Sequence, residues 1–142
     1  MESRMRSYTI KFLFVLFAVI GLAGMTSAQE KKGGNPEAAK VKNPVAATPE
    51  SVAAGEAVYM KRCRGCHAKD GSGGPPKDTG EEPAWPLNDD DWVHGNTDGE
   101  IFHVIRNGVP PSLVMEPWDD RISETDTWNL VNFIRTLNKN KK

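Results

Sequence analysis

Cys63-Arg64-Gly65-Cys66-His67 is a C-x-x-C-H motif, and it contains both cysteines of the 142-residue chain. Two thiols at this spacing on a helical turn can add to the two vinyl groups of a haem. The histidine that follows them then points its imidazole at the iron. We therefore predict that Cys63 and Cys66 attach one haem c covalently and that His67 is an axial ligand of its iron.

Two other kinds of site use a cysteine pair at this spacing. A thioredoxin-like redox pair is expected near a βαβ pattern, and the sequence has no alternating strand pattern. A structural zinc site usually needs four Cys or His ligands, and His94 and His103 are the two residues that could complete one. Two cysteines are also too few for a disulfide-stapled secreted scaffold. Haem attachment is the interpretation that we favour.

Helices are predicted on both sides of the motif, so the fold class is all-α with long loops. The first spans residues 49–62, with Thr48 as its N-cap and Pro49 at its first position. The sequence Thr97-Asp98-Gly99-Glu100 is a capping box that opens a second helix, which ends near Asn107 before Gly108. A third helix runs from Ser123 to about Leu137, with apolar residues at i, i+3, i+4 and i+7.

The segment between the first two helices is predicted to be loop, because residues 67–96 are rich in glycine, proline and aspartate. The folded domain would span residues 48–142, with a core of some 90 residues from Thr48 to about Leu137. Alone, that length gives a marginal core. A large apolar ligand in the middle would relieve this shortage.

The sixth ligand of the iron is sought among the remaining methionines and histidines. Downstream of residue 28 the methionines are Met60 and Met115. Met60 precedes the motif on the same predicted helix, so it cannot swing to the opposite face of the haem. Met115 lies in a proline-rich loop and can reach across, so we predict Met115 as the ligand. His103 and His94 are the alternatives; His103 is expected to point away from the apolar face of its helix into solvent, and His94 lies in a loop.

The N-terminal 28 residues have the layout of a secretory signal peptide. Arg4, Arg6 and Lys11 form a basic region, Phe12 to Met25 is a run of apolar residues and glycine, and small residues end at Ala28. The run is shorter than the about 20 apolar residues that a membrane span needs. We predict cleavage after Ala28, which places the protein in the periplasm or outside the cell. Retention of the segment as a membrane anchor is the alternative.

Residues 29–47 contain two aliphatic residues larger than alanine, Val41 and Val45. Such a composition buries little apolar surface, so we predict a flexible tether.

The formal net charge of the whole chain is -1, which argues against a nucleic-acid binder.

Residues 48–137 resemble a class I c-type cytochrome. The resemblance implies that Gly55 and Tyr59 of the first helix pack against Leu130 and Phe133 of the last. It also implies a loop after the histidine, here Gly73-Gly74-Pro75-Pro76, in which a proline carbonyl accepts the hydrogen bond of the ligand histidine; Pro75 and Pro76 are both possible. The loop of residues 107–118 is similar to the sixth-ligand loop of the family, although Glu116 separates Met115 from Pro117.

Three further residues are candidates for contact with the haem. Trp85 and Trp92 lie in a region where related proteins pack aromatic side chains on the haem, and a plain core role is the alternative for both. Arg106, near the end of the second helix, is predicted either to pair with a haem propionate or to be an ordinary surface arginine.

An iron with histidine and methionine ligands has both axial positions filled, so the expected function is transport of single electrons rather than catalysis. The expected partners are redox proteins: a respiratory oxidase or cytochrome complex and a periplasmic dehydrogenase. One alternative is a haem c subunit permanently docked on a dehydrogenase or oxidase complex. Another is a haem enzyme or gas sensor with a weak sixth ligand. A basic rim beside the motif, formed by Lys61, Arg62, Arg64 and Lys69, is the expected docking face.

Overall fold

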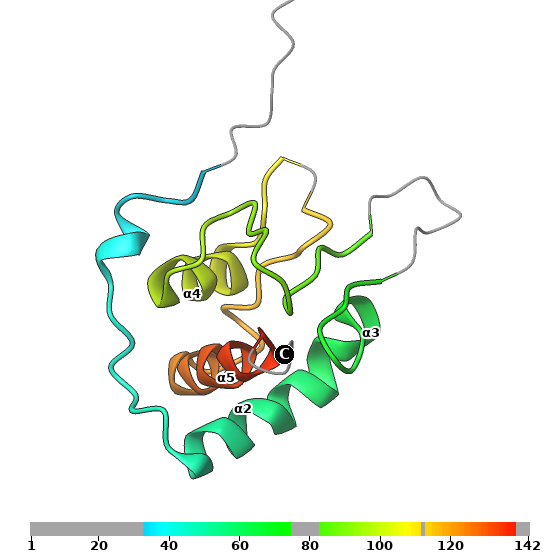
Figure 1. The fold of residues 1–142 in the computed structure, drawn as a ribbon. Coiled ribbons are helices and arrows are strands. Elements are labelled where there is room, and N and C mark those ends of the chain that lie inside the picture. The colour runs from blue at the N-terminus through cyan, green and yellow to red at the C-terminus, as the bar shows by residue number, and fades with distance from the viewer. Residues whose placement is uncertain (1–32, 75–82, 112, 139–142) are drawn as a thin grey trace, which may run out of the picture. The chain divides into compact units, whose positions relative to one another are not determined.

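The computed structural model describes residues 33–74, 83–111 and 113–138. Its elements are a short 3-10 helix η2 (Ala38–Lys40) and four α-helices: α2 (Pro49–Arg62), α3 (Arg64–His67), α4 (Asp98–Asn107) and α5 (Glu124–Leu137). Figure 1 shows them in chain order. The described residues contain no strand, so the all-α prediction is confirmed. The three main helices were all predicted, and α3 is an additional single turn.

Each main helix begins where a polar side chain can satisfy a free backbone N–H. The Thr48 hydroxyl accepts from Ser51 N at 3.2 Å, and the Ser123 hydroxyl accepts from Asp126 N at 3.1 Å. At α4 the capping box is complete, because Thr97 and Glu100 bind each other's backbone N–H. Local signals of this kind fix the helix starts before any tertiary packing is considered.

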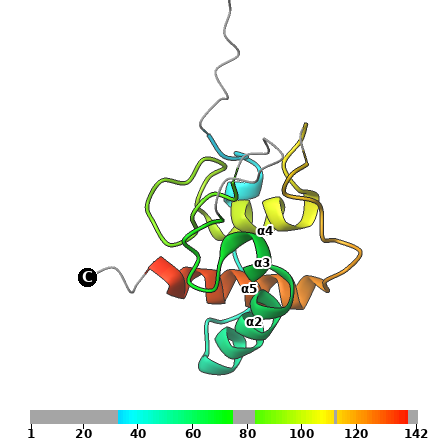
Figure 2. The same ribbon diagram turned by 90° about the vertical axis from the view of Figure 1, so that its right-hand side faces the viewer.

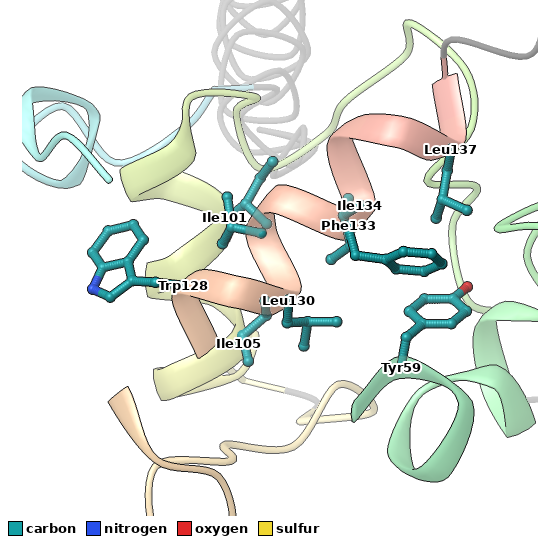
Figure 3. Close-up of a cluster of buried hydrophobic side chains, with 9 residues drawn as sticks. Tyr59, Ile101, Ile105, Trp128, Leu130, Phe133, Ile134 and Leu137 are labelled. Atoms are coloured by element: carbon teal, nitrogen blue, oxygen red, sulfur yellow. The ribbon is translucent and has the colours of Figure 1, made fainter. Parts of the chain in front are cut away.

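Helices α2 and α5 cross at Gly55. A Cβ added at Gly55 would collide with the carbonyl oxygen of Asn129 and lie 2.9 Å from Cβ of Phe133. One turn later, the rings of Tyr59 and Phe133 lie 5.1 Å apart between centroids, and Leu130 is fully buried beside them. Figure 3 shows these side chains meeting between the two helices. The pairing that the family resemblance implied for these helices is confirmed.

Helix α4 covers another side of α5. Ile101 and Ile105 are buried in the same core as Trp128, and the ring of Phe102 stacks on Trp128 with centroids 3.8 Å apart. The indole N–H of Trp128 is buried without a hydrogen-bond partner among the described residues. The buried core is therefore organised around α5, which contributes most of its side chains.

Residues 33–47, which we call the strap, contact the rest of the domain, whereas the composition predicted a flexible tether. Within the strap, Ala38 is buried and the side chain of Asn43 donates to the Trp128 carbonyl oxygen at 3.2 Å and to Oδ1 of Asn132 at 2.8 Å. In Figure 1 the strap runs along the side of the domain formed by α4 and α5. The composition did not indicate these contacts, because Asn43 makes them through amide hydrogen bonds rather than through an aliphatic side chain.

The strap also changes the surroundings of His103, which was expected to face solvent. Nε2 of His103 lies 3.3 Å from Nδ2 of Asn35 in the strap, and its Nδ1 lies 3.1 Å from Nδ2 of Asn107.

The residues of the expected signal peptide and residues 29–32 lie outside the described part of the chain. Over the residues that are described, no helix has the length and apolar character needed to cross a membrane.

Candidate haem-attachment site

The C-x-x-C-H motif occupies the junction between α2 and α3. Helix α2 ends at Arg62, and the carbonyl oxygen of Cys63 accepts from Cys66 N at 3.1 Å and from His67 N at 3.0 Å. These bonds place both thiols and the imidazole on one helical turn, which faces the viewer in Figure 2. The local backbone therefore has the form that the attachment chemistry requires.

The two thiols are free and lie in different surroundings. Cys66 is exposed, whereas Cys63 is half-buried and packs against the hydrophobic core. Burial, and secondarily the neighbouring Cys66, raises the pKa of the Cys63 thiol to about 11. Cys63 is thus a neutral apolar side chain at the edge of the core.

His67 is oriented by a backbone carbonyl from a distant loop. Its Nδ1 lies 3.3 Å from the carbonyl oxygen of Trp85. A carbonyl can only accept, so Nδ1 carries the proton and Nε2 keeps its lone pair for a metal. Burial lowers the pKa of His67, against a smaller opposite effect of the Trp85 hydrogen bond, and this favours the neutral imidazole. The predicted acceptors, Pro75 and Pro76, lie outside the described residues; among the described residues, the Trp85 carbonyl oxygen is the partner of Nδ1.

The backbone that follows His67 is held from two sides. The hydroxyl of Tyr59 donates to the carbonyl oxygen of Ala68 at 2.8 Å and contacts that of His67 at 3.3 Å. Gly73 N also donates to the His67 carbonyl oxygen, at 3.1 Å. Burial raises the pKa of Tyr59 well above its usual range, so the hydroxyl stays protonated and able to donate. Tyr59 thus links the core to the backbone at His67 and Ala68.

Glycine is required where this loop passes the segment containing Trp85. Gly73 has a φ of +85°, and a Cβ there would collide with the carbonyl oxygen of Ala84. Gly74 N donates to the same carbonyl at 3.3 Å. The two loop segments therefore run close together, and this proximity brings the Trp85 carbonyl to His67.

Met115 lies in the loop between α4 and α5, as the sequence predicted. Its carbonyl oxygen accepts from Val109 N at 2.9 Å, and Trp118 N donates to the Ile105 carbonyl oxygen at 3.0 Å. Its side chain is half-buried and packs against the edge of the core. The loop is thus folded back onto the end of α4, with Met115 held near its middle.

The other candidate residues occupy varied places. Nη1 of Arg106 donates to the carbonyl oxygen of Ile122 at 2.7 Å, so its guanidinium connects α4 to the segment before α5. Trp92 is half-buried against the core, and its indole N–H donates to the Asp89 carbonyl oxygen at 2.9 Å. Trp85 contributes its carbonyl to His67, but 47% of the residue is exposed. Sequence reasoning did not anticipate the Trp85 carbonyl, because the contact joins residues 18 positions apart across a loop.

The donor set of the site fits a covalent haem. Two free thiols and a neutral imidazole lie on one turn, and a thioether is carried by a separate loop. Three large apolar residues in the loops, Trp85, Leu113 and Val114, are between 43% and 47% exposed.

A zinc site finds no comparable support. Among residues 33–74, 83–111 and 113–138, no group of three or more His, Cys, Asp or Glu side chains is arranged to hold a metal ion. His103, one of the two histidines needed to complete such a site, faces Asn35 and Asn107.

A comparison with protein families agrees with the geometry. Residues 50–134 match the model of the family described as cytochrome C oxidase, cbb3-type, subunit III. The match covers more than half of the chain and includes the C-x-x-C-H turn, the loop that contains Met115, and most of α2 and α5. A domain of this family implies electron transfer through haem c. The chain therefore belongs to the cbb3-type cytochrome c oxidase subunit III family and carries a class I c-type cytochrome domain over residues 50–134.

Proposed function

We propose that this protein is an exported monohaem cytochrome that carries single electrons between redox proteins. The observation that carries the proposal is the single turn on which Cys63, Cys66 and His67 lie, with Nδ1 of His67 held by the Trp85 carbonyl. When bound, the haem supplies one-electron exchange between ferric and ferrous iron.

The residues of the chain would divide the remaining tasks. Cys63 and Cys66 would hold the haem by thioether bonds, and His67 would supply Nε2 to the iron in an orientation set by Trp85. Met115 would supply its sulfur as the sixth ligand, which raises the reduction potential and leaves no open position for substrate. The core between α2 and α5 excludes water behind the site.

The second candidate function is that of a haem c subunit permanently bound in an enzyme complex. It is favoured by the family description, which names a subunit of an oxidase. In that case the partner would be an oxidase or dehydrogenase complex that holds the haem domain permanently. Purification from native membranes separates the two functions: a mobile carrier elutes alone in gel filtration, whereas a subunit elutes with its complex. The N-terminal segment would make the carrier periplasmic if cleaved and membrane-tethered if retained.

The ligand assignment is tested by substituting the two methionines in turn. Met115→Ala should abolish the methionine-to-iron charge-transfer band, lower the reduction potential and let carbon monoxide bind the ferrous protein. Met60→Ala is the matched control, because Met60 is also half-buried against the core and should keep the band. An unchanged spectrum in Met115→Ala would show that another residue is the sixth ligand.

A further inference from the structure

The loop segment after Met115 is held by the side chain of Arg121. Nη2 of Arg121 donates to the carbonyl oxygen of Pro117 at 2.7 Å and to Oε2 of Glu116 at 3.0 Å. The guanidinium carbon lies 4.3 Å from the ring centroid of Trp118. One guanidinium therefore contacts each of the three residues that follow Met115 in the chain.

Backbone bonds fix the two sides of this contact. Arg121 N and Ile122 N both donate to the Trp118 carbonyl oxygen, at 3.1 and 3.0 Å. Arg121 therefore belongs to a hydrogen-bonded turn that begins at Trp118. Trp118 N in turn is bound to the end of α4 through the Ile105 carbonyl oxygen. The backbone of Arg121 is thus held by the turn that begins at Trp118 and, through Trp118, by the end of α4. Its guanidinium binds Glu116 and Pro117 of the loop that contains Met115.

The contact also gives Glu116 a structural role. This residue separates Met115 from Pro117 in the sequence, and its carboxylate is the ion-pair partner of Arg121. A second carboxylate, that of Asp120, lies 3.4 Å from Nε of Arg121. The guanidinium can therefore bind acceptors on both edges while its face lies on the indole of Trp118.

We propose that Arg121 is a positioning residue for Met115, and that its contacts with Glu116, Pro117 and Trp118 hold the Met115 loop closed over the haem iron. The inference rests on the proposed function, since it takes Met115 as the sixth ligand. Replacement of the thioether by another ligand requires the methionine side chain to move away, and this movement is easier when its loop is free to open. A side chain that favours the closed loop therefore slows every exchange reaction at that position.

The size of the effect follows from the chemistry of the contacts. The side chains of Arg121 and Glu116 are 39% and 61% exposed, so water and salt weaken their ion pair. An exposed ion pair, a hydrogen bond to a carbonyl and a surface cation–π contact together favour the closed loop by a factor on the order of ten.

The test measures how fast imidazole replaces the methionine in the ferric, full-length haem protein. At saturating imidazole the rate equals the rate of loop opening. Arg121→Ala should raise it about tenfold, and Arg121→Lys, which keeps the charge, should fall between Arg121→Ala and the unchanged protein. The control is Arg135→Ala, because Arg135 forms a comparable ion pair with Asp98 at 2.8 Å between α5 and α4. The control should leave the rate within about twofold.

A second measurement separates positioning from general stability. Salt at 1 M shortens the screening length to about 3 Å, so it should speed exchange in the unchanged protein more than in Arg121→Ala. Equal rates in the Arg121→Ala and Arg135→Ala proteins would overturn the proposal while leaving methionine ligation intact. Absence of the methionine-to-iron band in the unchanged protein would overturn both the ligand assignment and the role of Arg121.

Discussion

Gly55 is the position where helices α2 and α5 come closest. Replacing it with alanine should destabilise the folded protein by about 1–3 kcal/mol, because the added Cβ meets the Asn129 carbonyl and overpacks the crossing. The matched control is Glu56→Ala, since Glu56 is exposed on the same helix. Urea denaturation of the haem-loaded variants measures the difference. Equal stabilities of the two variants would contradict the close helix crossing.

Ala68, directly after His67, has a backbone conformation that alanine rarely adopts. Its φ and ψ are 61° and 170°, a region that belongs essentially to glycine and costs other residues about 1–3 kcal/mol. Ala68→Gly should therefore stabilise the protein by about 1 kcal/mol, after allowing for the greater entropy of glycine in the unfolded chain. The measurement is the thermal unfolding midpoint of the haem-loaded protein. A lower midpoint would show that the turn is not strained.

At the scale of whole segments, a buried asparagine of α5 holds the strap in place. Asn132 of α5 is 5% exposed and binds Asn43, the Val45 carbonyl and the Ser51 hydroxyl at distances from 2.8 to 3.1 Å. Asn43→Ala removes the donor to Oδ1 of the buried Asn132. The loss should lower the free energy of unfolding by about 1–3 kcal/mol. Asn107→Ala removes an exposed asparagine and should change stability by less than about 0.5 kcal/mol.

Hydrogen exchange would show where that stability is lost. In Asn43→Ala the amides of the strap should lose protection first, while those of α2 and α5 stay protected. Uniform loss over all helices, or no loss in the strap, would mean that the strap is not held through Asn132.

The difference between the predicted helices and the unpredicted strap has a physical cause. The start of α4 is encoded within four residues, because Thr97 and Glu100 satisfy each other's backbone groups, and such a signal is visible in the sequence. The strap is held by Asn43 and Asn132, which lie 89 positions apart, and an isolated asparagine carries no mark of its partner.

The residues of the site also fall into those that local sequence spacing predicts and those that depend on contacts between distant segments. Cys63, Cys66 and His67 follow from local spacing, and the structure places them on one turn. The carbonyl that orients His67 depends on how two loops pass each other at Gly73, so the motif alone did not indicate Trp85. Arg121 was missed for a related reason: nothing in the sequence marks one surface arginine as the partner of Glu116.

The charges of the domain form an asymmetric pattern around the motif. Lys61, Arg62, Arg64 and Lys69 are exposed at the end of α2 and around α3. Acidic residues gather in other loops, at Asp89 to Asp91 and at Asp119 and Asp120. Such an arrangement would steer an acidic redox partner toward the attachment turn, with an association rate that falls as salt rises.

Reversing two charges in this basic rim tests the steering. The variant with Lys61→Glu and Arg62→Glu should accept electrons from an acidic redox protein more slowly at low salt, and should approach the unchanged protein at 1 M salt. Lys40→Glu with Lys42→Glu is the control, because it changes the net charge equally but on the strap. Stopped-flow reduction measures the rates. Equal slowing by both variants would assign the effect to net charge, and no slowing by either would remove the docking face.

Covalent attachment of one haem at the C-x-x-C-H turn is the claim on which the ligand, carrier and positioning arguments depend. Intact-mass spectrometry of the protein, exported from a cell that matures c-type cytochromes and then denatured, tests it directly. We predict a mass equal to the polypeptide plus one haem, and the mass of the bare polypeptide when Cys63 and Cys66 are both changed to serine. A bare mass for the unchanged protein, or a haem that survives denaturation in the double variant, would contradict the account.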